Sequence, residues 1–221
     1  KNYLKKITII LIIHKGEKKK IISFLDKIPK LIEIIIIENS NDIKLKEKIK
    51  KKFKNASVYL VKNNGVGSAL NFASKKVKTE YFIHIGTDII FNFTKLKLFY
   101  NYAKKINNKF SALGPRFLNV NKKSHRQSDI NLEISKITSV HGSVFFLHKK
   151  TFKELNGFDE NIFLYFEETD FCKRAMKKNL PAYQLNNIKV KVTGRSVSIK
   201  NLQRKTNLQN LLSWHFIWSE F

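Results

Sequence analysis

Two groups of acidic residues stand close together in a chain that is otherwise strongly basic. The first is Asp159-Glu160, and the second is Glu167-Glu168-Thr169-Asp170, which follows an apolar run at 162–166. A carboxylate beside apolar side chains is suited to general-base chemistry, because burial adjusts its pKa towards that of the group it deprotonates. Acids at a helix start also complement the helix dipole, and Asp170 has Arg174 as a partner one turn later. Both interpretations are open on these residues alone.

A lone aspartate and a glycine-rich loop are the other features that could carry chemistry. Asp88 follows an apolar run at 81–85 and is a candidate ligand for Mg²⁺ or Mn²⁺ on a diphosphate, although an aspartate after a strand is also a common turn residue. The loop Asn64-Gly65-Val66-Gly67-Ser68 precedes a predicted helix, whose N-terminus favours anions. It lacks the Lys-Ser/Thr pair of a P-loop and the third glycine of a dinucleotide-binding loop, which argues against ATPases and dehydrogenases.

The charge balance raises the question of an anionic partner. The formal net charge is +26, and of the 43 basic residues only Arg116, Arg126, Arg174, Arg195 and Arg204 are arginines. Base readout and bidentate phosphate binding favour arginine, so the scattered lysines argue against a specific nucleic-acid partner. They indicate a solvated surface first and a peripheral contact with an anionic membrane second.

Cysteine content and chain length limit the class of protein further. Cys172 is the one cysteine in the sequence, so no internal disulfide forms and a cytoplasmic location fits. The longest clean apolar run, at 7–13, has seven residues and is too short to cross a bilayer. The histidines show no zinc-ligand spacing, and no Gly-x-Ser-x-Gly sequence suggests a hydrolase. A length of 221 residues predicts a single domain.

Apolar runs and helical spacings alternate along the chain and predict an α/β fold. Strands are expected at 7–13, 33–37, 58–61, 81–85, 110–113 and 144–147, and helices at 18–28, 43–53, 68–76, 94–106, 151–155 and 168–178. This alternation predicts a doubly wound, mostly parallel sheet whose ligand site lies beyond the carboxyl ends of the strands. The stretch at 119–134 is polar and is predicted to be a loop.

Several ordered motifs resemble the family 2 inverting glycosyltransferases, which have a GT-A fold, and most closely their rhamnosyltransferase-like branch. The motifs are the opening apolar strand, the run at 34–40, Asn64-Gly65-Val66-Gly67 with Asn71, Gly86-Thr87-Asp88, Gly114-Pro115-Arg116 and, the most specific, the run at 156–174. The resemblance covers nearly the whole chain. It implies a donor-binding half at about 1–110 and an acceptor and catalytic half at about 111–221.

The resemblance also implies roles for individual residues. Glu168 occupies the general-base position, and Glu167 and Asp170 would shape its surroundings. The residues expected at the nucleotide-sugar donor are Glu38, Asn39, Asn64, Gly67, Asn71 and Asp88. The implied reaction transfers a sugar from a nucleotide-diphosphate donor to a glycan or lipid-linked acceptor with inversion. It would serve surface polysaccharide or glycolipid synthesis in the cell envelope, at or near the inner face of the membrane.

The sequence departs from the family pattern at two positions that bear on the metal. Gly86 stands where the first acid of the metal motif is expected, and Lys191 or Val192 stands at the position of a late histidine. Dependence on Mg²⁺ or Mn²⁺ is therefore doubtful, and Lys191 or Arg195 is a candidate to stabilise the leaving group instead. The alternative is a non-catalytic relative that binds the nucleotide sugar or a glycan.

The end of the sequence is rich in large apolar and aromatic side chains. These are Leu208, Leu211, Leu212, Trp214, Phe216, Ile217, Trp218 and Phe221. They predict a helix that packs on the domain, with an interfacial membrane contact as the alternative. The sequence stops inside this pattern and begins without methionine, so we expect it to be part of a longer chain.

Overall fold

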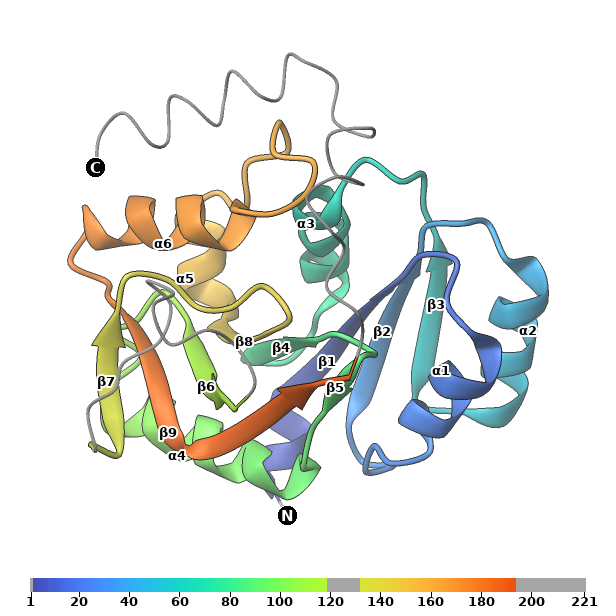
Figure 1. Cartoon of the computed structure of the whole chain (residues 1–221), viewed down its shortest axis with the longest axis horizontal. Helices are drawn as coiled ribbons and strands as arrows, with labels where there is room; N and C mark the ends of the chain where they lie inside the picture. Colours follow the sequence, from blue (N-terminus) through green and yellow to red (C-terminus); the bar gives the residue numbers. More distant parts are fainter. Residues whose placement is uncertain (1, 119–131, 194–221) are drawn as a thin grey trace.

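A computed structural model gives the fold and describes residues 2–118 and 132–193 (Figure 1). The strands in these ranges are β1 (Ile7–Ile13), β2 (Glu33–Glu38), β3 (Ala56–Leu60), β4 (Tyr81–Ile85), β5 (Ile89–Ile90), β6 (Leu113–Phe117), β7 (Ile134–Ile137), β8 (Val144–His148) and β9 (Ala182–Val192). The helices are η1 (Asn2–Lys6), α1 (Lys18–Leu25), α2 (Ile43–Lys52), α3 (Val66–Lys76), η2 (Phe93–Lys95), α4 (Leu96–Lys105), α5 (Lys149–Glu154) and α6 (Glu167–Met176).

The strands form one sheet that changes direction in its middle. Its order is β3-β2-β1-β4-β8-β6-β9-β5, with β7 paired to β9. The first four strands of this order run parallel, so β1, β2 and β4 end at the same edge. Strand β8 runs antiparallel to β4 and pairs Val144 with Ile85. The loop that leads into β8 therefore lies at the edge where β4 ends, and it joins the carboxyl-end site that the parallel strands define.

Helices cover both faces of this sheet, as a doubly wound fold requires. Side chains of α1, α2 and α4 pack with one apolar cluster, and side chains of α3, α5 and α6 pack with the other. Strands β1, β2 and β4 lie between the two clusters, which explains why their sequences are apolar without alternation. None of the helices within 2–118 and 132–193 has the length and apolar character to span a bilayer.

The predicted α/β fold with a mostly parallel, doubly wound sheet is confirmed, and the bounds of β1 and β4 match the apolar runs. Two local predictions are wrong, and one strand was missed. The strand expected at 110–113 is β6, which begins at Leu113. The predicted loop at 119–134 reaches into the start of β7, and its residues 119–131 lie outside the described part of the chain. Strand β9 was not predicted at all.

The buried histidine of β4 makes the stability of the fold depend on pH. His84 is 6% exposed, and its Nδ1 atom lies 3.2 Å from the carbonyl oxygen of Ile10. Burial lowers the pKa of His84 from 6.5 to about 4, against a smaller opposing effect of that hydrogen bond. The folded chain therefore resists protonation at this ring, whereas the unfolded chain binds the proton at its ordinary pKa.

We expect the free energy of unfolding to be highest above pH 6.5 and to fall as the pH drops from 6.5 towards about 4. The loss attributable to His84 is about 3 kcal/mol, because the unfolded state binds more protons over this window. Urea unfolding of wild type and His84→Asn between pH 4 and 7.5 measures it. The variant should lose most of this slope and keep the smaller part due to His148, whose pKa burial also lowers. Equal slopes in both proteins would contradict the assignment.

Candidate active site

The loops after β1 and β2 are joined by backbone and side-chain hydrogen bonds. The backbone N–H of Asn39 donates to the carbonyl of Ile13 at 2.8 Å, and the N–H of Lys15 donates to Ser40 Oγ at 3.1 Å. These bonds continue the pairing of the two parallel strands past their ends. They fix the polar residues 38–42 beside the end of β1, at the edge where a ligand site was predicted.

Glu38 is fully buried and organises the loop that follows it. Its carboxylate accepts hydrogen bonds from the N–H of Ser40 at 3.0 Å, from the N–H of Asp42 at 2.7 Å and from the Ser40 hydroxyl. Asp42 in turn caps α2 by accepting from the N–H of Leu45 at 2.9 Å, and a hydrogen bond from Lys18 lowers its pKa. The Glu38 carboxylate, expected at the nucleotide-sugar donor, thus already accepts hydrogen bonds within its own loop.

Asn39, next to Glu38, has a buried side-chain oxygen without a hydrogen-bond donor among the described residues. Its residue is 9% exposed, and its side-chain oxygen accepts no hydrogen bond within the described part of the chain. A buried amide oxygen that lacks a donor is costly unless water or a ligand supplies one. Asn39 therefore offers a buried acceptor that is still available at this edge of the sheet.

The glycines before and within α3 make room for the segment at 156–166, which leads into the acid pair Glu167 and Glu168. Gly65 has a φ of +101°, and a Cβ there would lie 2.3 Å from the carbonyl oxygen of Phe163, which accepts from the N–H of Val66 at 3.0 Å. A Cβ at Gly67 would lie 3.1 Å from Cβ of Phe158. Gly67 is buried against protein, whereas Asn64 is exposed on the loop. In this structure the two glycines allow α3 to approach the segment at 156–166 closely.

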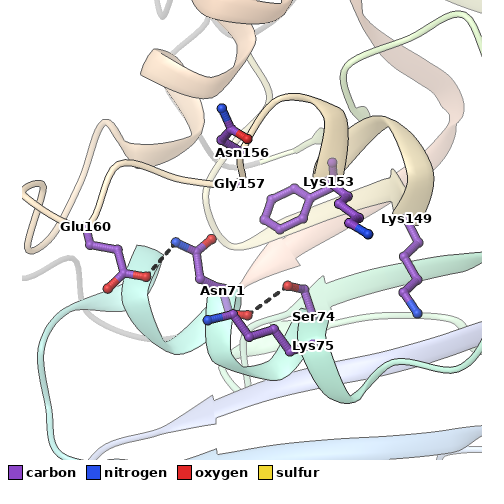
Figure 2. Close-up of a pocket in the computed structure, with 9 residues that line it drawn as sticks. Asn71, Ser74, Lys75, Lys149, Lys153, Asn156, Gly157 and Glu160 are labelled. Carbon is purple, nitrogen blue, oxygen red and sulfur yellow. Dashed lines mark hydrogen bonds between the residues drawn. The ribbon is translucent and has the colours of Figure 1, made fainter.

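Asn71 holds the same segment through its side-chain amide. Its Nδ2 donates to the carbonyl of Phe158, and its Oδ1 accepts from the N–H of Phe158, both at 2.9 Å. The Nδ2 atom also donates to Glu160 Oε1 at 2.9 Å, as Figure 2 shows. Gly157 has a φ of +67°, and a Cβ there would lie 2.4 Å from Asn71 Oδ1. The amide predicted to contact the donor is therefore occupied by protein on both its oxygen and its nitrogen.

Arg174 ties α6 to the same segment from the other side. Its Nε donates to Asp170 at 2.8 Å, which confirms the pair predicted from the helical spacing. Its two terminal nitrogens donate to the carbonyls of Leu155 at 2.6 Å and Gly157 at 2.7 Å. Asp170 thus orients a guanidinium that holds the start of the segment, and this wider network has no signature in the sequence.

The backbone turns sharply just before the acid pair. Tyr165 and Phe166 have φ values of 66° and 70°, a left-handed conformation that costs free energy in residues other than glycine. Helix α6 starts at the next residue, and its first turn carries Glu167, Glu168 and Asp170 near the positive end of the helix dipole. Burial raises the pKa of Tyr165, and the negative charge of Glu167 raises it further.

Glu167 and Glu168 are 3% and 1% exposed and lie against the loop that enters β8. A Cβ added to Gly142 would lie 3.3 Å from Glu168 Oε2 and 3.8 Å from Glu167 Oε1. A glycine at this position therefore leaves space in front of both carboxylates. In the same loop, the carbonyl of Ser143 accepts from the N–H of Gly86 at 2.7 Å.

Gly86 belongs to the turn that carries Asp88. A Cβ at Gly86 would lie 2.7 Å from Asp88 Oδ1, so the absence of a side chain lets the Asp88 carboxylate fold back over the turn. The carbonyl of Asp88 accepts from both the N–H and the hydroxyl of Thr193 at 2.7 Å, just after β9. The loop at 142–143 is therefore in contact with the acid pair on one side and with the Asp88 turn on the other.

Of the residues predicted to bind a metal or to stabilise the leaving group, Asp88 and Lys191 lie within the described part of the chain and Arg195 does not. Asp88 is exposed, and within 2–118 and 132–193 no three His, Cys, Asp or Glu side chains gather as a metal site. Lys191 is exposed on β9, where it pairs with Ile90 of β5, two residues before the Thr193 that holds Asp88. Arg195 lies outside the described residues, as does the predicted apolar helix at the end of the sequence.

Comparison with known proteins supplies the family. Residues 9–177 match the model of glycosyl transferase family 2. The chain belongs to this family. An uncharacterized glycosyltransferase of Rickettsia typhi is 26% identical over 97% of this chain and 71% of its own length. The low-salt glycan biosynthesis hexosyltransferase Agl10 of Haloferax volcanii is 20% identical over 79% of this chain, which spans 62% of Agl10.

Solved structures agree on the GT-A fold. TarS of S. aureus, residues 1–349 in complex with UDP-GlcNAc, aligns over 87% of this chain with a TM-score of 0.67 and 19% identity. GalNAc-T7 with UDP, GalNAc and Mn²⁺ aligns over 86% of this chain with a TM-score of 0.67 and 14% identity. The chain spans 60% of that TarS chain and 43% of GalNAc-T7. At these identities the likeness establishes the fold.

Replacing Asn71 with alanine should destabilise the protein by about 2–4 kcal/mol, because it leaves the buried N–H and C=O of Phe158 without their partners. Ser74→Ala on the same helix is the matched control, since its hydroxyl donates to a helix carbonyl, that of Asn71, and its removal should cost less than about 1 kcal/mol. Urea unfolding measures both. Equal losses of unfolding free energy in the two variants would show that the amide bridge stabilises the protein no more than a single helix hydroxyl does.

Proposed function

We propose that this chain is an inverting glycosyltransferase that moves a sugar from a nucleotide-diphosphate donor to an acceptor hydroxyl, with Glu168 as the general base. The observation that carries the proposal is the contact of one loop with two acidic elements. Gly142 lies against the carboxylates of Glu168 and Glu167, and Ser143 binds the turn of Asp88. Family membership and the buried position of Glu168 support this role.

The proposed reaction is a single displacement at the anomeric carbon. The acceptor oxygen forms a bond to this carbon while the bond between the carbon and the donor phosphate oxygen breaks. The acceptor proton passes to the carboxylate of Glu168, and the nucleoside diphosphate leaves with the bonding electron pair. Attack opposite the leaving group inverts the anomeric configuration. Glu167 raises the negative charge around the base, and Asp170 acts indirectly by orienting Arg174.

The donor is proposed to lie over the ends of β1, β2 and β4. Asn39 offers a buried oxygen acceptor there, and Glu38 shapes the loop that surrounds it. Asn64 lies exposed at the rim, whereas Asn71 and Gly67 act by holding the segment at 156–166. TarS was solved with UDP-GlcNAc and GalNAc-T7 with UDP and GalNAc, which supports a nucleotide sugar as the donor class.

The finer specificity is part of the proposal. We propose a hexosyl or rhamnosyl donor and a glycan or lipid-linked acceptor of the cell envelope, reached from the cytoplasmic side at the membrane surface. The glycan-synthesis hexosyltransferase among the relatives and the high positive charge support this. The second candidate is a non-catalytic nucleotide-sugar-binding protein, which Gly86 favours because it replaces one acid of the family's metal motif.

Glu168→Gln separates the two candidates. Thermal shifts with UDP, dTDP and GDP and with UDP-GlcNAc and dTDP-rhamnose first identify the donor, since a ligand of the native state raises its stability. For an enzyme, Glu168→Gln should then lower the release of nucleoside diphosphate by about 10²–10⁴-fold with donor binding kept. Glu154→Gln, exposed on α5, is the control and should keep full activity. Binding without turnover in the wild type would support the binding protein.

Chelation and substitution of Asp88 test whether the reaction depends on a metal ion. One carboxylate there suits a cation that takes its other ligands from diphosphate oxygens and water. If Mg²⁺ or Mn²⁺ assists, EDTA should abolish nucleotide release and Asp88→Asn should raise the metal concentration needed for half-maximal activity. If Lys191 replaces the cation, EDTA should leave the rate unchanged and Lys191→Gln should lower it by about tenfold or more. Lys189→Gln, exposed on the same strand, is the matched control.

A further inference from the structure

We propose that a cavity between α3 and α5 binds a phosphate group of an anionic ligand, at a site separate from the active site. The cavity has a volume of about 540 Å³, within the range of small-molecule sites. Figure 2 shows Lys149 and Lys153 on the helix at one side of it and Lys75 on the helix at the other. Three lysines from two elements therefore line one cavity.

The cavity carries a net positive charge. Glu160 also lines it, but its two carboxylate oxygens accept from Asn71 at 2.9 Å and from Ser68 at 3.2 Å. Within the described residues neither Lys75 nor Lys153 makes an ion pair, and both side chains are exposed. Their charges are therefore accessible to an anionic ligand.

Lys149 gives the cavity a fixed cationic point. This side chain is half-buried, and its ammonium group donates to the carbonyl of Val77 at the end of α3. An ammonium group has three donors, so the others remain available for phosphate oxygens. A charge held in place by protein loses less side-chain entropy on binding than a freely moving surface lysine.

A second cavity extends the same cationic surface. It has a volume of about 520 Å³ and shares Lys75 and Lys149 with the first, and Lys76 and Lys78 add to its lining. The lysines of both cavities lie towards the edge of the sheet opposite the acid pair, because Lys149 follows the end of β8 and His148 pairs with Tyr81 at the start of β4. The other end of the first cavity is formed by Asn71, Gly157 and Glu160. The cationic end is therefore separate from the proposed donor site.

The chemistry fits a phosphate on a polar ligand. The Ser74 hydroxyl and the exposed side chain of Asn156 line the cavity beside the lysines and suit hydroxyl groups of the same ligand. The phosphate has two possible sources, a soluble phosphorylated compound or an anionic lipid headgroup. The site does not depend on the proposed sugar transfer, because none of its lysines belongs to the active site.

Pyrophosphate titration by calorimetry tests the site. Lys75→Gln/Lys153→Gln should weaken binding by about tenfold or more, since two charge-assisted hydrogen bonds are lost. The matched control, Lys50→Gln/Lys97→Gln, removes the same charge from exposed positions on α2 and α4 and should change affinity less than about twofold. Lys75→Arg/Lys153→Arg should retain binding. Pyrophosphate at the donor site would affect both neutralised variants equally, so their difference isolates this cavity.

Vesicle sedimentation distinguishes the two sources. Phosphatidylcholine vesicles with phosphatidic acid should retain wild type and the control variant but release Lys75→Gln/Lys153→Gln if the ligand is a headgroup. A defect of this variant with soluble pyrophosphate alone would identify a soluble ligand. Equal behaviour of both neutralised variants with both probes would overturn the proposal, whatever the result of the Glu168→Gln experiment.

Discussion

The amide bridge between Asn71 and Phe158 is the interaction on which the geometry of the acidic site depends. A primary amide presents a donor and an acceptor side by side, as a peptide group does, so it pairs with both the N–H and the C=O of one residue. Gly65 and Gly67 permit the close approach of α3 that this bridge needs. Arg174 then secures the start of the same segment to α6. These contacts determine the position of Glu167 and Glu168.

The reversal of strand direction between β4 and β8 completes the site. In a purely parallel sheet, the loop entering a strand lies at the opposite edge from the loops that leave its neighbours. Because β8 is antiparallel to β4, the loop at 142–143 enters at the edge where β4 ends. This loop then touches both Gly86 and the carboxylates of α6. Gly86 and Glu168, which are far apart in the sequence, thereby meet the same loop through a backbone hydrogen bond and a side-chain contact.

The sequence predicted the part of the fold that hydrophobicity alone dictates. Strands buried on both faces, such as β1 and β4, are continuous apolar runs, and the pairing of Asp170 with Arg174 follows from helical spacing. Strand β9 was not predicted because lysine and valine alternate at 189–192, so only one face of its C-terminal end is buried. The hydrogen bonds by which Asn71 and Glu38 hold neighbouring segments were not predicted, because the partners are backbone groups, which have no sequence signature.

One further signal was readable but unused. An asparagine on the apolar face of a predicted helix, beside Leu70 and Ala73, is a poor helix former in a buried position, and such a residue needs a hydrogen-bonding reason. The donor role expected for Asn71 came instead from its place in a family motif. Motif membership locates a residue near a site, but its contacts decide whether it serves the ligand or the scaffold.

The Gly86 turn determines where the Asp88 carboxylate lies in this structure. A side chain at position 86 would occupy the space that the Asp88 carboxylate now fills, with 2.7 Å between the two atoms concerned. An aspartate at 86 and the present rotamer of Asp88 are therefore mutually exclusive. An acid at position 86 would therefore require the exposed Asp88 side chain to turn outwards into solvent.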